Sequence, residues 1–340
     1  MEITYENFRN DYSDICYPEI LDYIKENLDQ INPGYGVDDH SKNAEKLIKE
    51  KLEDENVDIY FIHGGTGANI LGASVGMMPQ ESIIAATSGH IEDQEAGAIE
   101  ACGIKIETIL TDDGKITKKL LEEKYKSFTN EHHTVPRKVY ISNTTEVGTL
   151  YSKKDLEEIY DFCKKHDLYL FMDGARLAHA MANEKSDLKF KDLTKLCDIF
   201  YFGGTKNGLM FGEALVIVND DLKKNFRNLQ KQKGAMLAKG FITGLMFERL
   251  FQDDLYIKGA KKAYKMAKKL AQGFEEKGYK LAYEFESNQV FVEISDKDIK
   301  KWEKFAYFEV GEKREDKFVA RFVTTYKSQE KEIEEFLERI

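Results

Sequence analysis

A lysine in a glycine-rich turn is the residue best suited to do chemistry in this sequence. Lys206 follows the apolar run Asp198–Phe202 and stands within Gly-Gly-Thr-Lys-Asn-Gly at residues 203–208. Small residues let a ligand approach the backbone closely. A lysine that is desolvated in such a place can lose its charge and attack a carbonyl group. Because the chain has 50 Lys and Arg residues, a surface lysine in a turn would be the simpler interpretation if this segment stood alone.

A second segment places an acid and an arginine after another apolar run. Met-Asp-Gly-Ala-Arg occupies residues 172–176, and an aspartate at the carboxyl end of a parallel strand points into the crevice where α/β proteins bind ligands. Beside a pyridine nitrogen, Asp173 would keep that nitrogen protonated and make the ring a strong electron sink. The alternative is a cap on the turn before a helix at Ala178–Ala182. Arg176 offers a planar fork for a carboxylate, with a surface salt bridge as its alternative.

The segment His-Gly-Gly-Thr-Gly-Ala-Asn at residues 63–69 joins a predicted strand to a predicted helix. Backbone amides at a helix N-terminus can hold a phosphate, and here Gly65 and the Thr66 hydroxyl would contribute. A dinucleotide-binding loop is the competing interpretation. Against it, Ile70 stands where that fingerprint has a glycine, and the next strand ends without an acidic residue for a ribose.

Two further strands end in residues that suit the same ligand. His90 could stack on a cofactor ring or carry a proton, and Glu95 could orient it, although a lone histidine is more often structural. Asn143 offers a side-chain donor for the phenolic oxygen of the cofactor. Successive strands therefore end in residues suited to one molecule of pyridoxal phosphate, and this joint pattern is far more specific than any of its parts.

Short β-branched and aromatic runs alternate with longer amphipathic segments in this sequence. This pattern predicts a mostly parallel, seven-stranded α/β sheet flanked by helices, which must position these residues. The predicted strands are Asp58–Ile62, Ser82–Ala86, Lys105–Leu110, Lys138–Ser142, Leu168–Met172, Asp198–Phe202 and Ala214–Val218. The predicted helices are Ser41–Glu53, Thr66–Gly76, Glu92–Cys102, Thr117–Ser127, Lys153–His166 and Leu222–Leu237.

The pattern changes after about residue 250. A Lys-rich helix at Tyr256–Lys277 leads into four short strands and a final helix at Ser328–Ile340. We therefore expect residues 1–250 to form a large cofactor-binding domain, whose N-terminal arm reaches the active site, and residues 251–340 to form a small α+β domain. The predicted strands of the small domain are Tyr279–Glu284, Gln289–Ile294, Phe305–Val310 and Phe318–Thr324.

Composition narrows the class of protein. The net charge of -11 disfavours nucleic acid and anionic membranes as partners, and no apolar run approaches the roughly 18 residues of a membrane span. The N-terminus has no signal-peptide pattern, and the four cysteines form no CxxC pair, so we expect a cytoplasmic protein with free thiols. The pair His132-His133 lacks a third ligand, and we predict a solvated loop there and no metal.

With these residues identified, nearly the whole chain resembles the threonine aldolase / β-eliminating lyase family of fold-type I pyridoxal-phosphate enzymes. The segments closest to the bacterial low-specificity L-threonine aldolase branch are Thr-Glu-Val-Gly-Thr-Leu-Tyr at 145–151, Met-Asp-Gly-Ala-Arg at 172–176 and Phe-Gly-Gly-Thr-Lys-Asn-Gly at 202–208. The resemblance implies a cofactor bound through Lys206, with His90 stacked on the ring.

The resemblance also assigns further roles. It implies that Asp173 contacts the pyridine nitrogen, that Gly65 and Thr66 contact the phosphate, and that Arg176 and Arg321 hold the carboxylate of an amino-acid substrate. Many relatives have Arg-Ser-Asp-Thr where this chain has Arg-Asn-Asp-Tyr at residues 9–12, so Asn10 replaces a serine that contacts the substrate. Family members are dimers or tetramers with shared active sites, and Tyr35 and Lys231 are weaker candidates for contacts across subunits.

Two reactions remain open on this scaffold. An aldolase would cleave the Cα–Cβ bond of threonine or allo-threonine after His90, or a water that it positions, takes the β-hydroxyl proton. A β-eliminating lyase or an aminotransferase would first remove the Cα proton. A regulator that binds the cofactor without catalysis is a third interpretation, but the sequence contains no appended basic helix-turn-helix, and the lysine, aspartate and histidine positions are all filled.

Overall fold

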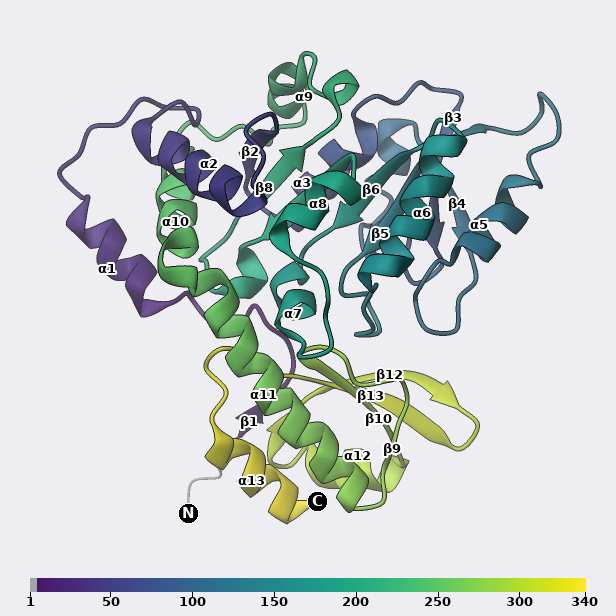
Figure 1. Ribbon diagram of the computed structural model, residues 1–340. Helices are drawn as coiled ribbons and strands as arrows, with labels where there is room; N and C mark the ends of the chain where they lie inside the picture. The colour runs from purple at the N-terminus through teal and green to yellow at the C-terminus, as the bar shows by residue number, and fades with distance from the viewer. Residues whose placement is uncertain (1–4) are drawn as a thin grey trace.

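The seven strands predicted for the first part of the chain form one sheet in the computed structural model, which describes residues 5–340 (Figure 1). The strand order is β2-β8-β7-β6-β5-β3-β4. The pairings make six strands parallel, and β8 runs opposite to its neighbours β7 and β2. The strands are β2 (Asp58–Ile62), β3 (Glu81–Ala86), β4 (Lys105–Ile109), β5 (Val135–Ser142), β6 (Tyr169–Asp173), β7 (Ile199–Gly203) and β8 (Glu213–Ile217).

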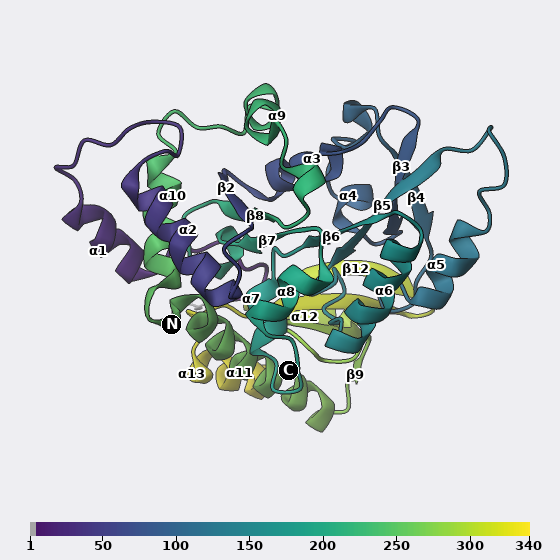
Figure 2. The ribbon, with the colours of Figure 1, turned by 45° about the horizontal axis from the view of Figure 1, so that its top comes forward.

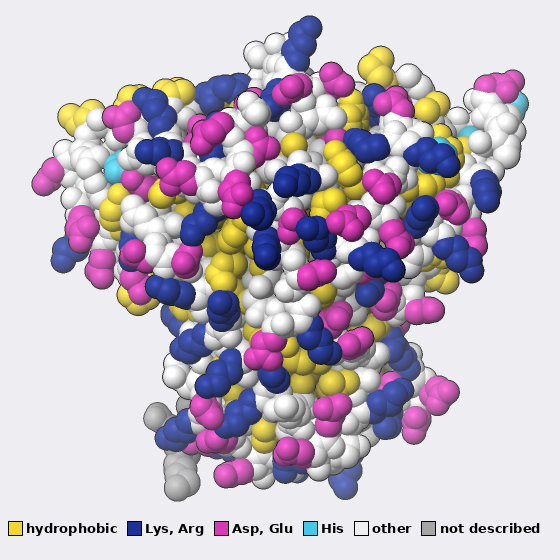
Figure 3. All heavy atoms as spheres, viewed as in Figure 1, with side chains coloured by type: hydrophobic (Ala, Val, Ile, Leu, Met, Phe, Trp, Pro, Cys, Tyr) yellow, Lys and Arg dark blue, Asp and Glu magenta, His cyan; other side chains and the backbone are white. Residues whose placement is uncertain are grey.

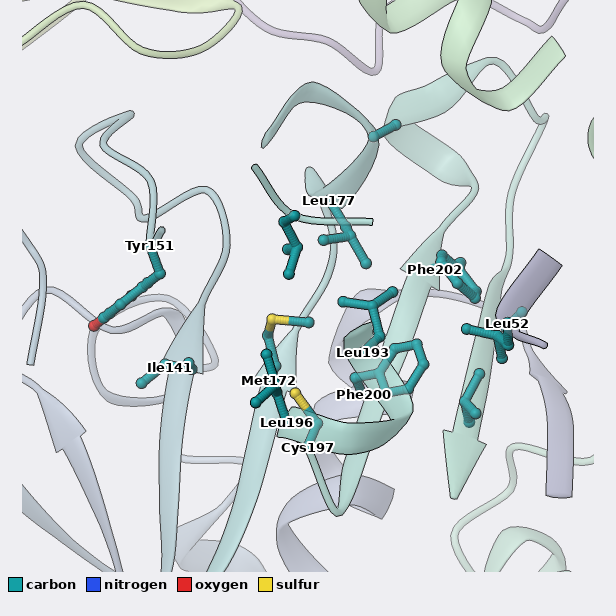
Figure 4. Close-up of a cluster of buried hydrophobic side chains, with 14 of the residues drawn as sticks. Leu52, Ile141, Tyr151, Met172, Leu177, Leu193, Leu196, Cys197, Phe200 and Phe202 are labelled. Atoms are coloured by element: carbon teal, nitrogen blue, oxygen red, sulfur yellow. The ribbon is translucent and has the colours of Figure 1, made fainter. Parts of the chain in front are cut away.

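Both faces of this sheet are buried, which explains its continuous apolar strands. Along β7, Phe200 and Phe202 enter one apolar cluster, whereas Ile199 and Tyr201 enter a second cluster on the other face. Figure 4 shows part of the first cluster, where Phe200 and Phe202 lie beside Leu193. The helices of the large part are α1 (Pro18–Glu26), α2 (Asp39–Leu52), α3 (Gly65–Ser74), α4 (His90–Asp93), α5 (Lys118–Tyr125), α6 (Lys153–Lys165), α7 (Leu177–Ala182), α8 (Phe190–Leu196), α9 (Phe226–Gln232) and α10 (Phe241–Phe251).

The smaller part is built on a four-stranded antiparallel sheet of order β12-β13-β10-β9. The long helix α11 (Leu255–Glu276) runs from the large part down along this sheet (Figures 1 and 2). Trp302, Phe274 and Phe336 lie at the centre of its core. The remaining elements are β9 (Lys280–Leu281), β10 (Gln289–Ile294), α12 (Asp296–Trp302), β11 (Ala306–Tyr307), β12 (Glu309–Arg314), β13 (Lys317–Val323) and α13 (Glu330–Arg339).

The N-terminal arm belongs to both parts. Its strand β1 (Glu6–Asn7) pairs with β11 of the smaller part, and the segment that follows leads back to the edge of the large sheet. We keep the division into residues 1–250 and 251–340 as a proposal, with residues 1–4 outside the described residues. In that division the arm is the segment that ties the large part to the small one.

Several predicted elements were wrong in extent. The helix predicted at Glu92–Cys102 is only α4 and a 3-10 turn at Glu100–Cys102, because Ala96 and Gly97 have φ values of 50° and 75°, which an α-helix cannot contain. The helix predicted at Leu222–Leu237 is reduced to α9, since Gly234 has a φ of 72°. The strand predicted at Phe305–Val310 is divided between β11 and β12, and Tyr279–Glu284 contributes only β9. The prediction did not include α1, α8, α10 or α12.

The surface carries both signs of charge. Figure 3 shows Lys and Arg interspersed with Asp and Glu over the visible face, with small apolar areas between them. Within residues 5–340, none of the helices is long and apolar enough to cross a membrane. All four cysteines are free thiols.

Candidate active site

The sheet edge at which the parallel strands end encloses a cavity of about 240 Å³. Because β8 is antiparallel, it begins at this edge, and its first residue Glu213 is in register with Gly203 of β7 and Ile62 of β2. The cavity is lined by Tyr12, Gly65, Thr66, Asn69, His90, Ser142, Thr144, Glu146, Asp173, Ala175, Arg176, Tyr201, Thr205, Lys206 and Glu213. Six of the residues predicted from the sequence therefore meet in one place, namely Gly65, Thr66, His90, Asp173, Arg176 and Lys206.

Asp173 is a buried carboxylate at the end of β6, and its surroundings keep it ionised. Its Oδ2 accepts hydrogen bonds from the Tyr140 hydroxyl at 2.6 Å and the Asn69 amide at 3.0 Å, and its Oδ1 accepts one from the Ala175 amide at 2.9 Å. Burial alone would raise the pKa of Asp173, but the nearby His90 and the Tyr140 hydrogen bond lower it below its ordinary value. A charged carboxylate therefore faces the cavity.

His90 begins α4 and is oriented by a buried acid. Its Nδ1 lies 2.7 Å from Oε1 of Glu95, and the same oxygen accepts a hydrogen bond from the Asn69 amide at 2.8 Å. Burial lowers the pKa of His90, but the Glu95 hydrogen bond and the charge of Asp173 outweigh it and raise the pKa overall. This contact leaves Nε2 as the ring nitrogen that can exchange a proton with a ligand.

Lys206 lies in a short 3-10 turn, Thr205–Asn207, directly after β7. Asn207 anchors this turn by donating from its amide to the carbonyl oxygens of Gly203 at 2.6 Å and Ala175 at 3.1 Å. Burial and the neighbouring Arg176 lower the pKa of the Lys206 amine. The amine lies 6.0 Å from the centre of the Tyr12 ring. Desolvation thus makes the amine easier to deprotonate, as a nucleophilic lysine requires.

The N-terminus of α3 opens into the same cavity through Gly65 and Thr66. Among the described residues, no side chain caps this helix. Its first amides and the helix dipole therefore suit an anion such as a phosphate.

Two arginines approach the cavity from different parts of the chain. Arg176 is buried and forms a bidentate pair with Asp11, with Nε and Nη2 at 2.8 and 3.1 Å from the carboxylate oxygens. Arg321, on β13, pairs with Glu309, and its Nη1 lies 3.5 Å from Oε1 of Gln289. Burial and the nearby charge of Arg176 lower the pKa of Arg321.

Arg321 and two further predicted residues, Asn10 and Asn143, are not among the residues that line the cavity. The Oδ1 of Asn10 accepts hydrogen bonds from the Tyr12 amide at 3.0 Å and the Ser13 hydroxyl at 2.8 Å, which shapes the N-terminal arm. The side chain of Asn143 is directed to the backbone of Tyr151, with its Oδ1 3.2 Å from that amide. Both side chains are therefore engaged by the chain itself, and the nearby residues Tyr12, Ser142 and Thr144 line the cavity. The ligand contacts of Asn10 and Asn143 stay predictions.

Other candidates lie elsewhere. Tyr35 is beside a second cavity, and the Lys231 amine lies 5.0 Å from the centre of its ring. His132 and His133 are exposed in a turn, as predicted for a solvated loop.

Several cavity residues, above all Glu146 and Glu213, were not predicted from the sequence. Glu146 is in the loop after β5, and its Oε1 accepts from the Ser142 hydroxyl at 2.6 Å and from the His90 amide at 2.9 Å. Glu213 begins a strand instead of ending one. The antiparallel direction of β8 brings Glu213 to the cavity, and the apolar run at Ala214–Val218 does not reveal that direction.

Comparison with known proteins finds relatives over most of the chain. The sequence pattern of the β-eliminating lyase family matches residues 21–297. The low-specificity L-threonine aldolase of Pseudomonas aeruginosa is 31% identical over 298 residues, which cover 86% of this chain and 85% of that protein.

Solved structures give the same picture. The threonine aldolase of Leishmania major has a TM-score of 0.96 and 42% identity, and the match covers 98% of both chains. An aspartate aminotransferase variant of Thermus thermophilus has a TM-score of 0.74 at 13% identity, covering 99% of this chain and 91% of that one. The second match shows the fold alone.

The contact between His90 and Glu95 leads to a prediction. Replacing Glu95 with Gln removes the charge that stabilises the imidazolium, so the pKa of His90 should fall and its titration, followed by NMR, should move to lower pH. If His90 transfers a proton in the reaction, kcat/KM should drop by about 10- to 100-fold. The exposed neighbour Glu92→Gln is the control and should change neither quantity. An unchanged His90 titration in Glu95→Gln would refute the electrostatic role.

Proposed function

The chain belongs to the β-eliminating lyase family, and we propose that within it the protein is a pyridoxal-phosphate-dependent carbon–carbon lyase that cleaves threonine or allo-threonine into glycine and acetaldehyde. The observation that carries this proposal is the meeting of Lys206, Asp173 and His90 in one cavity. The names of the Pseudomonas aeruginosa and Leishmania major relatives support the choice of substrate.

The residues of the cavity fit pyridoxal phosphate. The Thr144 hydroxyl, which lines the cavity, is buried without a hydrogen-bond partner among the described residues, as expected where a ligand supplies the partner. The uncapped N-terminus of α3 suits the phosphate, and Asp173 would hold a proton on the pyridine nitrogen. When bound, the cofactor supplies an electron sink for the charge that develops at the substrate Cα.

The chain's own residues would then divide the remaining work. The Lys206 amine, with its lowered pKa, would hold the cofactor covalently until the amino group of the substrate replaces it. Nε2 of His90, with Nδ1 fixed by Glu95, would take the proton of the β-hydroxyl group as the Cα–Cβ bond breaks.

The substrate carboxylate would lie between Arg176 and Arg321. One edge of Arg176 is already occupied by Asp11, so its remaining Nη1 donors would be the ones that face the ligand. Arg321 would release part of its contact with Glu309 to complete the grip. By holding the carboxylate, these two residues would select α-amino acids.

Elimination of a β-substituent is the second candidate, favoured by the description of the family. In that reaction the Lys206 amine would remove the Cα proton first. The same residues would serve both reactions, so the products decide between them.

Product analysis tests the proposed function. Incubation of the purified protein with threonine should release acetaldehyde and glycine in equal amounts, whereas elimination would give ammonia and a keto acid. Lys206→Ala should lower turnover by more than about 1000-fold, and borohydride treatment of the wild type should label Lys206 with the cofactor in peptide mapping. The exposed Lys126→Ala should behave as the wild type. A label on another lysine would refute the site assignment.

Substitution of Arg321 tests the carboxylate site. A bidentate charged contact is worth about 2–4 kcal/mol, so Arg321→Ala should lower kcat/KM by roughly 30- to 1000-fold, mainly through KM. Arg321→Lys should recover only part of this, because an ammonium group cannot reproduce the planar fork. Glu309→Gln removes the salt-bridge partner and should leave kcat/KM within about threefold. If Arg321→Ala unfolds the protein while its folded fraction keeps full activity, the arginine has a structural role.

We also propose that the protein is a homodimer or homotetramer. The supporting observation is a set of exposed apolar side chains within residues 12–37, among which Ile31 is fully exposed and Leu28 is 70% exposed. Several apolar side chains left in water on one stretch of chain are typical of a subunit interface. Its exposed apolar residues are Tyr12, Ile15, Leu21, Leu28, Ile31, Tyr35 and Val37.

Sedimentation velocity tests this assembly. The wild type should sediment as two or four copies of the 39.2 kDa chain, and the double substitution Leu28→Asp/Ile31→Asp should shift it toward the monomer, because two charges would be desolvated at the interface. Leu110→Asp, at a position that is 79% exposed but lies outside the segment, is the control. A wild-type monomer would refute the proposal.

A further inference from the structure

Glu213 is a buried carboxylate in the cavity that the proposed mechanism does not use. It is the first residue of β8 and is only 3% exposed. Its position opposite Gly203 of β7 places it beside the turn that carries Lys206. A buried carboxylate next to a reactive amine needs a physical explanation, because burial of an acid is costly.

Both oxygens of Glu213 are bonded to the two residues that precede Lys206. Its Oε2 accepts a hydrogen bond from the Gly204 amide at 2.8 Å, and its Oε1 accepts one from the Thr205 hydroxyl at 2.8 Å. The Thr205 hydroxyl in turn accepts from the Gly212 amide at 3.1 Å. Together with Asn207, which anchors the other side of the turn, these bonds leave the lysine little freedom to move.

The charge of Glu213 acts on the same turn. Burial raises the pKa of Glu213 to about 7, while the hydrogen bonds from Thr205 and Gly204 and the charge of Lys206 oppose that rise. The ionisable groups that face it are Lys206 from the turn, Asp173 from β6, Tyr201 from β7 and Tyr256 from α11. Lys206 is the only cation among these four, and the other three are acids, so the ionised Glu213 stabilises a positive charge on the nitrogen of Lys206.

We propose that Glu213 is the positioning residue for Lys206. The Glu213 carboxylate orients Lys206 by holding Gly204 and Thr205, and its charge helps to keep the nitrogen of Lys206 protonated. The inference rests on the proposed covalent link between Lys206 and the cofactor. It assigns a role to an acid that stands at the beginning of a strand. The alternative is a carboxylate that only closes the turn, with no influence on the proton of the lysine.

Three variants separate the clamp from the charge. Glu213→Gln keeps an acceptor for Gly204 and a polar partner for Thr205 but has no charge. Glu213→Ala removes both, and Thr205→Val removes one arm of the clamp while it keeps the charge. The exposed Glu131→Gln serves as the control. Each holoenzyme is titrated with acid and base while the visible absorption of the cofactor linked to Lys206 is recorded, and borohydride labelling of Lys206 measures how much of each protein carries the link.

The expected results differ among the variants. In Glu213→Gln the absorption should titrate at lower pH, so that the protonated fraction at the wild-type midpoint falls from one half to about one tenth, with labelling within about twofold of the wild type. Thr205→Val should keep the wild-type midpoint and label less. In Glu213→Ala the midpoint should shift as it does in Glu213→Gln. The labelling of Lys206 should fall by about tenfold or more when the cofactor is limiting.

Two results would overturn the inference. A wild-type midpoint in Glu213→Gln would show that the charge does not act on Lys206, and full labelling in Glu213→Ala would show that the clamp is not needed. If Glu213→Ala does not fold, the midpoint of the isosteric Glu213→Gln decides the question. Absence of a label on Lys206 in the wild type would instead refute the proposed function, and the two failures are therefore distinguishable.

Discussion

The cavity must hold an amine that can lose its proton a short distance from a carboxylate that must keep its charge. Burial lowers the pKa of Lys206 and by itself would raise the pKa of Asp173. The protein resolves the conflict by giving Asp173 three hydrogen-bond donors and His90 as a neighbour that lowers its pKa. Environments that push the pKa values of neighbouring groups apart are typical of acid–base sites. The rest of the cavity follows from this requirement.

The backbone at the sheet edge is shaped to bring these two groups together. The turn after β6 packs directly on the end of β7, since a Cβ atom on Gly174 would lie 1.7 Å from the Tyr201 carbonyl oxygen and one on Gly203 would lie 2.3 Å from that of Ala175. Only glycine fits at either position. The glycines near Asp173 and Lys206 therefore set the distance between the two strand ends as well as giving a ligand room.

The N-terminal arm connects this edge to the small sheet. Asp11 pairs with Arg176 of the large part and also accepts a hydrogen bond from the Asn288 amide of the small part at 3.0 Å. The arginine neighbour lowers the pKa of Asp11 well below its usual range, even though burial opposes this. A single buried carboxylate thus fixes the relative positions of the arm, the helix after β6 and the strand next to β13. This arrangement brings Arg321 toward Arg176 and Asp11, which are more than 100 positions away in sequence.

The sequence by itself determined the fold class, the seven strands and the family, because apolar runs bounded by glycine and polar residues are local patterns and the residues at parallel strand ends share one edge. Lys206, Asp173, His90, Gly65 and Thr66 could be found in this way. The tertiary structure alone decided the rest. Only the antiparallel direction of β8 brings Glu213 to the site, and the side chains of Asn10 and Asn143 turn to nearby backbone because those hydrogen bonds are available in the folded chain. Pairing direction and side-chain partners depend on contacts between distant residues, which no local pattern encodes.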